Sequence, residues 1–290
     1  MRNSSRVLTI FASVVVVSTA TLAWVVGSEL IAPAPAAIPD SALSIAHEAV
    51  SFPSGSGSSI HGWYVPAAQQ VGAVVLMHGV RANRLEMVGR ANFLHEAGYS
   101  VLLFDFQAHG ESPGEHITFG HLEALDAAAA VSFVRQRSTS QFVGVIGVSL
   151  GGAAAVLGAE ALPAQAFVLE AVYPSIDVAT ENRLEIRLGP MGRLLSPLLV
   201  RQLSWRLGID QSDLEPETGV RRLSAPILII AGSADRHTTL GDSQRLYTAA
   251  PDPKSLWIIP GAAHVDFEAY SHHEYQEHVL AFLEKCRGGA

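Results

Sequence analysis

Three residues far apart in the chain, Ser149, Asp235 and His264, have the side chains that nucleophilic catalysis requires. A serine hydroxyl attacks a carbonyl carbon efficiently only when a base removes its proton, and an imidazole needs a carboxylate to hold its tautomer. Ser149 stands between Gly147 and Gly151 in the pattern G-x-S-x-G. Glycines at these positions leave room for a tight strand-to-helix turn that pushes the hydroxyl outward.

The flanking sequence supplies the elements that must position these residues. Apolar runs precede them at residues 142–148, 226–232 and 256–260, and such runs predict buried strands. The alanine-rich segment 153–161 after the serine predicts a helix whose N-terminus lies beneath the hydroxyl. The chain order of serine, aspartate and histidine is one of three known orders for such triads, and it belongs to a predominantly parallel α/β sheet.

Five motifs, taken together and in order, resemble those of the α/β-hydrolase superfamily. The resemblance is strongest to small-lidded serine hydrolases of the serine aminopeptidase-like and monoacylglycerol-lipase-like kind, and it covers nearly all of the chain from about residue 46. It implies a mostly parallel central sheet with helices on both faces. The motifs are Leu76-Met77-His78-Gly79-Val80, the segment from Phe104 to Ser112, Gly147 to Gly151, Gly232-Ser233-Ala234-Asp235 and Gly261-Ala262-Ala263-His264.

The resemblance also implies roles for residues beside the triad. Backbone N–H groups of Val80 and Leu150 would hold the oxyanion of the tetrahedral intermediate, and His78 would brace the oxyanion loop. Glu170 ends the strand after the serine helix and is an alternative acid. Asp235 is favoured over it, because glycine and a polar loop flank Asp235 in the way that is usual for the triad acid.

The N-terminus has the features of a membrane segment. Arg2 and Arg6 precede residues 7–27, which contain no charged side chain and would be roughly 30 Å long as a helix. The basic residues favour a cytoplasmic N-terminus and a catalytic domain on the extracytoplasmic side of the cell membrane. The alternative is a signal peptide cleaved near Ala34-Pro35-Ala36, which would release a secreted domain.

The predicted organisation is therefore a cytoplasmic tail over 1–6, an anchor over 7–27, a linker over 28–45 and a hydrolase domain over 46–290. Residues 31–40 contain three prolines among alanines, a composition that predicts a semi-rigid spacer. Between about 173 and 223 no strand-like run occurs, so we expect a small lid of short helices above the strand ends. Its apolar residues either line an acyl pocket or simply cover the core.

The composition limits the classes of partner, metal and cofactor that we expect the protein to bind. A net charge of −8 argues against nucleic acid, and a single cysteine excludes an intrachain disulfide framework. We expect no metal, because His272 and His273 are adjacent and do not share a helix face, and no closely spaced carboxylate pair accompanies them. No glycine-rich phosphate loop is evident, so no cofactor is expected. The oligomeric state is left open.

The sequence predicts a membrane-anchored serine hydrolase that cleaves a carboxylic ester or thioester through an acyl-enzyme. Its partners would be a small-molecule acyl substrate and the lipid bilayer, which it contacts through the N-terminal helix. Two alternatives stay open: an aminopeptidase or other amidase with the same triad, and a membrane-tethered binding protein that keeps the fold without turnover.

Overall fold

The computed structural model describes residues 2–69, 71–138 and 140–288. Its centre is an eight-stranded sheet with the order β10-β9-β8-β7-β4-β5-β3-β2, in which β2 and β3 are antiparallel to their neighbours and the other pairs are parallel. The strands are β2 (Glu48–Pro53), β3 (Ser59–Val65), β4 (Gly72–Met77), β5 (Tyr99–Phe104), β7 (Val143–Val148), β8 (Ala166–Glu170), β9 (Ile227–Gly232) and β10 (Lys254–Ile259).

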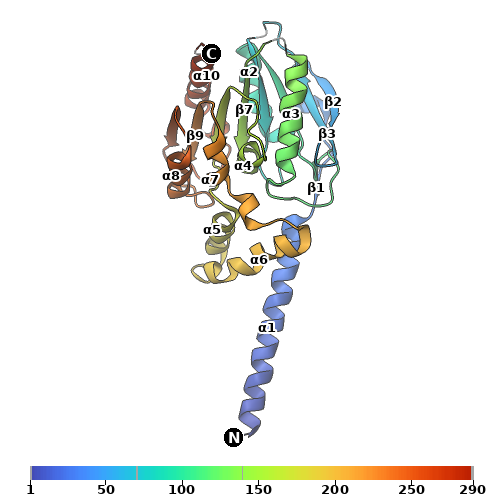
Figure 1. The fold of residues 1–290 in the computed structure, drawn as a ribbon, viewed down its shortest axis with the longest axis vertical. Coiled ribbons are helices and arrows are strands. Elements are labelled where there is room, and N and C mark those ends of the chain that lie inside the picture. The colour runs from blue at the N-terminus through green and yellow to red at the C-terminus, as the bar shows by residue number, and fades with distance from the viewer. Residues whose placement is uncertain (1, 70, 139, 289–290) are drawn as a thin grey trace.

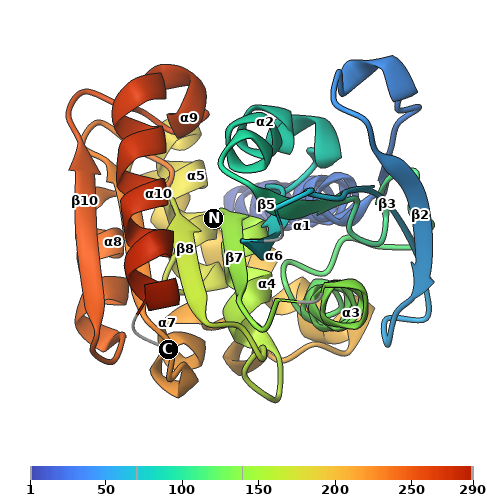
Figure 2. The ribbon, with the colours of Figure 1, turned by 90° about the horizontal axis from the view of Figure 1, so that it is seen from above.

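Helices cover both faces of this sheet (Figure 2). On one face pack α3 (Glu123–Arg137), α4 (Leu150–Leu157) and α8 (Leu240–Ala249), and on the other α2 (Val88–Glu96), α9 (Phe267–Tyr270) and α10 (His272–Gly288). Because both faces are covered, every residue of β4, β5, β8 and β9 is buried, which explains why these strands are apolar apart from Ser100 and Glu170. The predicted α/β-hydrolase fold is confirmed.

Helix α1 (Arg2–Ile31) projects from this body (Figure 1). Residues Val7–Ile31 have a mean hydropathy of 2.1, and only 6% of their most apolar window is buried within the protein. By length and composition this helix is able to cross a membrane, and a signal sequence has the same features.

The segment that follows α1 differs from the expected spacer. Ala34–Pro35 forms β1, which pairs in parallel with β6 (His109–Gly110), and the Ala34 N–H donates to the Ala108 carbonyl at 2.7 Å. Ile38 and Leu43 are buried in the core on the α2 face. A proline-rich sequence predicts an extended backbone, but not whether that backbone docks on a neighbouring loop. Here it docks, so α1 is joined firmly to the catalytic body.

The predicted lid region contains two substantial helices, α5 (Ile176–Leu188) and α6 (Met191–Leu207), and the one-turn helix α7 (Pro216–Gly219). Ser175 caps α5 by accepting a hydrogen bond from the Val178 N–H. Gly208, in the left-handed conformation with φ of 68°, ends α6. Both helices follow the carboxyl end of β8, and Figure 1 shows them on the side of the body from which α1 projects.

The packing of the central strands generates a stability prediction. Leu76 on β4 is fully buried, whereas Leu125 on α3 is 40% exposed. We expect Leu76→Ala to lower the free energy of unfolding by about 2 to 5 kcal/mol, because it removes buried methyl groups and leaves a cavity. The control Leu125→Ala should change it by less than about 0.5 kcal/mol. Urea denaturation of the two variants in detergent measures both, and equal losses would contradict the described core.

Candidate active site

Ser149 lies on a strained turn between β7 and α4. Its φ of 48° and ψ of −105° are unusual for a residue with a side chain. The neighbouring glycines are required by close approaches: a Cβ on Gly147 would lie 2.5 Å from the Gly152 nitrogen, and one on Gly151 would lie 2.2 Å from the Met77 carbonyl oxygen. The structure therefore has the strand-turn-helix geometry that G-x-S-x-G predicts, and the glycines allow α4 to pack against the end of β4.

Asp235 and His264 are brought together by the loops that follow β9 and β10. The His264 Nδ1 lies 2.7 Å from one Asp235 carboxylate oxygen. The other oxygen accepts the backbone N–H groups of His237 at 2.7 Å and Thr238 at 3.0 Å. The Asp235 side chain is fully buried, whereas that of His264 is 25% exposed. A carboxylate on Nδ1 fixes the tautomer that leaves Nε2 free to accept a proton.

The Ser149 hydroxyl is enclosed. The residue is 3% exposed, and its Oγ has no hydrogen-bond partner among the described residues. Asp235 and His264 are therefore hydrogen-bonded in the structure, whereas Ser149 and His264 are not. In the absence of substrate such bonds are often long and tighten only in the complex.

The two backbone groups expected to bind an oxyanion come from neighbouring strands. Leu150 is the first residue of α4, and Val80 follows the end of β4, the strand next to β7. The first N–H groups of a helix have no partner within it, so the Leu150 N–H is free to bind an anion. The contact between Gly151 and the Met77 carbonyl brings the start of α4 beside the loop that carries Val80.

His78 holds that loop in place. One ring nitrogen accepts the Phe106 N–H at 3.1 Å, and the other lies 2.7 Å from the Gly79 carbonyl oxygen, to which it donates. The pKa of His78 falls to about 3, mainly because of complete burial and to a smaller extent because of nearby His109, while the bond to Gly79 opposes the shift. His78 is therefore a neutral brace, as the resemblance implied, and both of its nitrogens are engaged.

Helix α5 contacts the loop that carries Asp235, a contact that no sequence motif indicates. The Asn182 side-chain amide donates to the His237 carbonyl at 3.1 Å, and the His237 ring lies 5.1 Å from the ring of His264. Burial lowers the pKa of His237, and His264, Arg183 and Arg187 lower it further, whereas Asp235 acts in the opposite direction. Burial also lowers the pKa of Arg183, which Tyr173 and Asp235 oppose. Two guanidinium groups of α5 therefore disfavour protonation of His237, the neighbour of His264.

Glu170, the alternative acid, is engaged elsewhere. Both of its carboxylate oxygens bind Arg90, at 3.0 and 2.7 Å, and one also accepts the Tyr275 hydroxyl at 2.6 Å. The three side chains are buried, and Arg90 also pairs with Asp266 at 2.9 Å. This network links β8, α2 and α10, so Glu170 supports the packing and Asp235 alone contacts the histidine.

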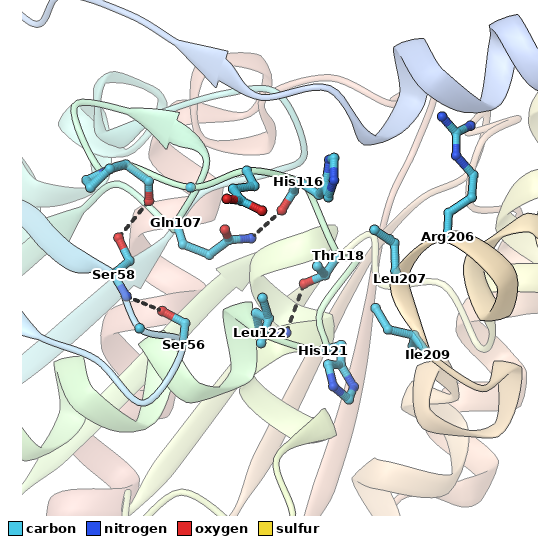
Figure 3. A pocket seen from close by; sticks show the side chains of 14 residues that line it. Ser56, Ser58, Gln107, His116, Thr118, His121, Leu122, Arg206, Leu207 and Ile209 are labelled. Carbon is cyan, nitrogen blue, oxygen red and sulfur yellow. Dashed lines mark hydrogen bonds between the residues drawn. The ribbon is translucent and has the colours of Figure 1, made fainter.

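Figure 3 shows a cavity of about 720 Å³. It is bounded by the turn at Ser56 and Ser58, by the loop from Gln107 to Leu122 and by the end of α6, and no triad residue lines it. Within the described residues no group of three His, Cys, Asp or Glu side chains is arranged to hold a metal ion.

Comparisons with known proteins agree with this fold. Residues 68–205 match the family described as "Serine aminopeptidase, S33". An uncharacterized protein of Mycobacterium tuberculosis is 31% identical over 219 residues, which cover 73% of this chain and 70% of that protein. A solved esterase from Pyrococcus furiosus has a TM-score of 0.72 at 23% identity, covering 88% of this chain and 98% of its own. A solved membrane phospholipase A has a TM-score of 0.61 at 18% identity, and the match covers 97% of this chain and 96% of that protein.

The burial of neutral His78 generates a pH prediction. Its pKa falls from 6.5 to about 3 on folding, so below pH 6.5 the unfolded chain binds more protons and stability is lost as the pH falls. Asp126 has the opposite effect on stability as the pH falls. Burial raises its pKa to about 6, so near that pH the folded chain binds more protons at Asp126 than the unfolded chain does. The informative quantity is therefore the difference between wild type and His78→Gln.

We expect the free energy of unfolding of wild type to fall relative to His78→Gln by up to about 1.4 kcal/mol per pH unit below pH 6.5. Glutamine keeps an acceptor for the Phe106 N–H and does not titrate. Denaturant titrations over a pH series measure this difference. Parallel curves for the two proteins would contradict a buried neutral imidazole at this position.

Proposed function

The chain belongs to the α/β-hydrolase superfamily, and from this we propose that it is a membrane-anchored serine hydrolase that cleaves carboxylic esters. Membership supports hydrolase activity, and the ester preference is our proposal. The observation that carries it is the 2.7 Å contact of the buried Asp235 carboxylate with His264, at the sheet edge where the strained turn presents Ser149.

The proposed reaction has two halves. The Ser149 Oγ attacks the acyl carbonyl while His264 Nε2 takes its proton, and the N–H groups of Val80 and Leu150 bind the oxyanion. The tetrahedral intermediate then expels the alcohol, which leaves with the proton that His264 returns. In the second half His264 removes a proton from water as the water oxygen attacks the acyl-enzyme. The second tetrahedral intermediate then breaks its bond to the Ser149 oxygen, which takes the proton back from His264 as the carboxylic acid departs.

Substrate entry requires a movement of the lid. The Ser149 hydroxyl is buried in the structure, and the contact between Asn182 and His237 holds α5 against the loop that carries Asp235. We infer that α5 and α6 shift to admit the acyl group, as lids do in many enzymes that exclude water from the reaction.

The family description favours a second candidate, an aminopeptidase that acts on amides. Such an enzyme must bind a free ammonium group near the scissile bond, which calls for a carboxylate. The lid groups that act on His237 are instead the guanidinium groups of Arg183 and Arg187. Like charges repel, so these arginines support an ester with a neutral or anionic partner over a peptide amine.

The location is part of the proposal. We propose that α1 anchors the protein in the cell membrane with the hydrolase domain on the extracytoplasmic side, since Arg2 and Arg6 favour retention of the N-terminus in the cytoplasm. Cleavage of α1 as a signal peptide is the alternative. The firm packing of residues 31–43 on the body supports an intact anchor, because cleavage near residue 36 would remove β1.

Three substitutions test the assignment of roles on p-nitrophenyl esters of increasing acyl length. We expect Ser149→Ala to lower kcat on the order of 10⁶-fold and Asp235→Asn about 10⁴-fold, because they remove the nucleophile and the tautomer control. Glu170→Gln should leave kcat within a few-fold but destabilise the protein by about 3 to 5 kcal/mol, since it unpairs buried Arg90.

Steady-state kinetics and urea denaturation of each variant provide the two readouts. A catalytically dead Glu170→Gln beside an active Asp235→Asn would reverse the acid assignment. Full activity of Ser149→Ala would refute the serine mechanism and bring forward the binding-protein alternative.

A further inference from the structure

Helix α6 leaves a row of large apolar side chains exposed on its outer side. Its inner side buries Gly192, Ser196 and Gln202, together with Val200 and Leu203, which pack in a small apolar cluster. A helix that faces water normally keeps its outer side polar. The large apolar side chains on its outer side are Met191, Leu194, Leu198 and Trp205, which are 56%, 71%, 42% and 77% exposed.

These four side chains form one stripe. Their spacings of three, four and seven residues place them on a single side of α6, with exposed Arg201 between Leu198 and Trp205. On the inner side, a Cβ on Gly192 would lie 2.4 Å from the Leu184 carbonyl carbon, so α5 and α6 pack closely there. A contiguous apolar patch of this kind marks an interaction surface.

The same helix is joined to α1. The Gln202 amide donates to the Ala23 carbonyl at 2.9 Å, and Arg206 donates to the Ser28 hydroxyl at 2.7 Å. The Arg206 guanidinium also lies 4.2 Å from the centre of the Trp24 ring. These bonds fix α6 at the level of Trp24 to Ser28 along α1.

This part of α1 is where the hydrocarbon core of a bilayer would end. About 20 helical residues cross the hydrocarbon core, so a span that begins at Val7 ends near Trp24 to Ser28. Tryptophan is enriched at this boundary between hydrocarbon and headgroups. Figure 1 shows α6 running across α1 just above the free part of that helix, with the body on the other side of α6.

The charge of α6 fits the same surface. The helix carries three arginines and no acidic residue, within a chain of net charge −8. Arg193 pairs with Glu185 of α5 at 2.9 Å, whereas Arg201 stands exposed on the stripe. Arginine beside an apolar face buries its stem and keeps its charge at the headgroups, where anionic lipid contributes about 1 kcal/mol per basic residue.

The catalytic edge of the sheet lies on this side too. Arg81, next to the proposed oxyanion donor Val80, donates to the carbonyl oxygens of Glu29 and Ala32 at 3.0 and 3.1 Å. These carbonyls end α1, so the anchor meets the body at the carboxyl ends of the strands, where Ser149 also lies.

We propose that α6 lies flat on the bilayer, with Met191, Leu194, Leu198 and Trp205 inserted among the lipids at the base of the anchor. Helix α6 and the adjoining α5, which contacts the loop carrying Asp235, are then at the membrane surface, and acyl substrates reach the site from the lipid phase. This proposal rests on the membrane anchoring proposed above and does not depend on which ester is cleaved.

Spin labels on single cysteines in the full chain test it, in vesicles of phosphatidylcholine and phosphatidylglycerol. In a Cys286→Ser background the label is placed by Leu198→Cys on the stripe, by Leu125→Cys on α3 and by Val16→Cys on α1. Leu198 and Leu125 are matched in exposure, at 42% and 40%, and Val16 is 67% exposed. Collisions with oxygen, which partitions into lipid, are compared with collisions with a water-soluble nickel complex.

We expect the oxygen-to-nickel ratio at Leu198 to match that at Val16 and to exceed the ratio at Leu125 several-fold. A water-like ratio at Leu198 beside a lipid-like ratio at Val16 would overturn the proposal and leave the anchor standing. If the label at position 198 is shielded from both oxygen and nickel, the proposal is overturned, because α6 is then covered by a second copy of the chain or by another protein. A water-like Val16 would overturn the anchoring itself, while hydrolysis of a soluble ester in the same vesicles reports the triad independently.

Discussion

The approach of α4 to the end of β4 is the contact on which the rest of the site depends. Only a hydrogen atom on Gly151 fits against the Met77 carbonyl, and this proximity forces the backbone through an unusual conformation at Ser149. The strain is tolerated because the buried strand β7 and the buried start of α4 fix the two ends of the turn. As a result the serine, the first N–H of α4 and the loop after β4 meet at one edge of the sheet.

Two polar systems support this edge and remain separate from each other. Asp235 accepts three hydrogen bonds, from two backbone N–H groups and one imidazole, and so holds His264 in one orientation. On the face of the sheet that α2 and α10 cover, Glu170 of β8 binds Arg90 of α2 and Tyr275 of α10. The first system bears on the proposed chemistry, and the second on the rigidity of the strand beside the nucleophile.

The sequence predicted what depends on local patterns. Buried strands are apolar over most of their length, and the Ser149 turn needs glycines at fixed positions, so both could be recognised from residue types alone. The partners of Glu170 lie 80 and 105 positions away, and no spacing rule indicates them. The docking of β1 was missed for the same reason. The exposed apolar row on α6 was missed because the apolar side chains of this region were expected to cover the core or to line an acyl pocket.

Every step of the proposed reaction requires Ser149 to be an activated nucleophile. Reaction of the full-length protein with a fluorophosphonate probe, followed by mass spectrometry of the labelled peptide, tests this requirement. We expect a single adduct on the Ser149 oxygen that disappears when the protein is unfolded before labelling, because activation requires the assembled site. An adduct on another residue, or no adduct in folded protein whose lid has been opened by detergent, would contradict it.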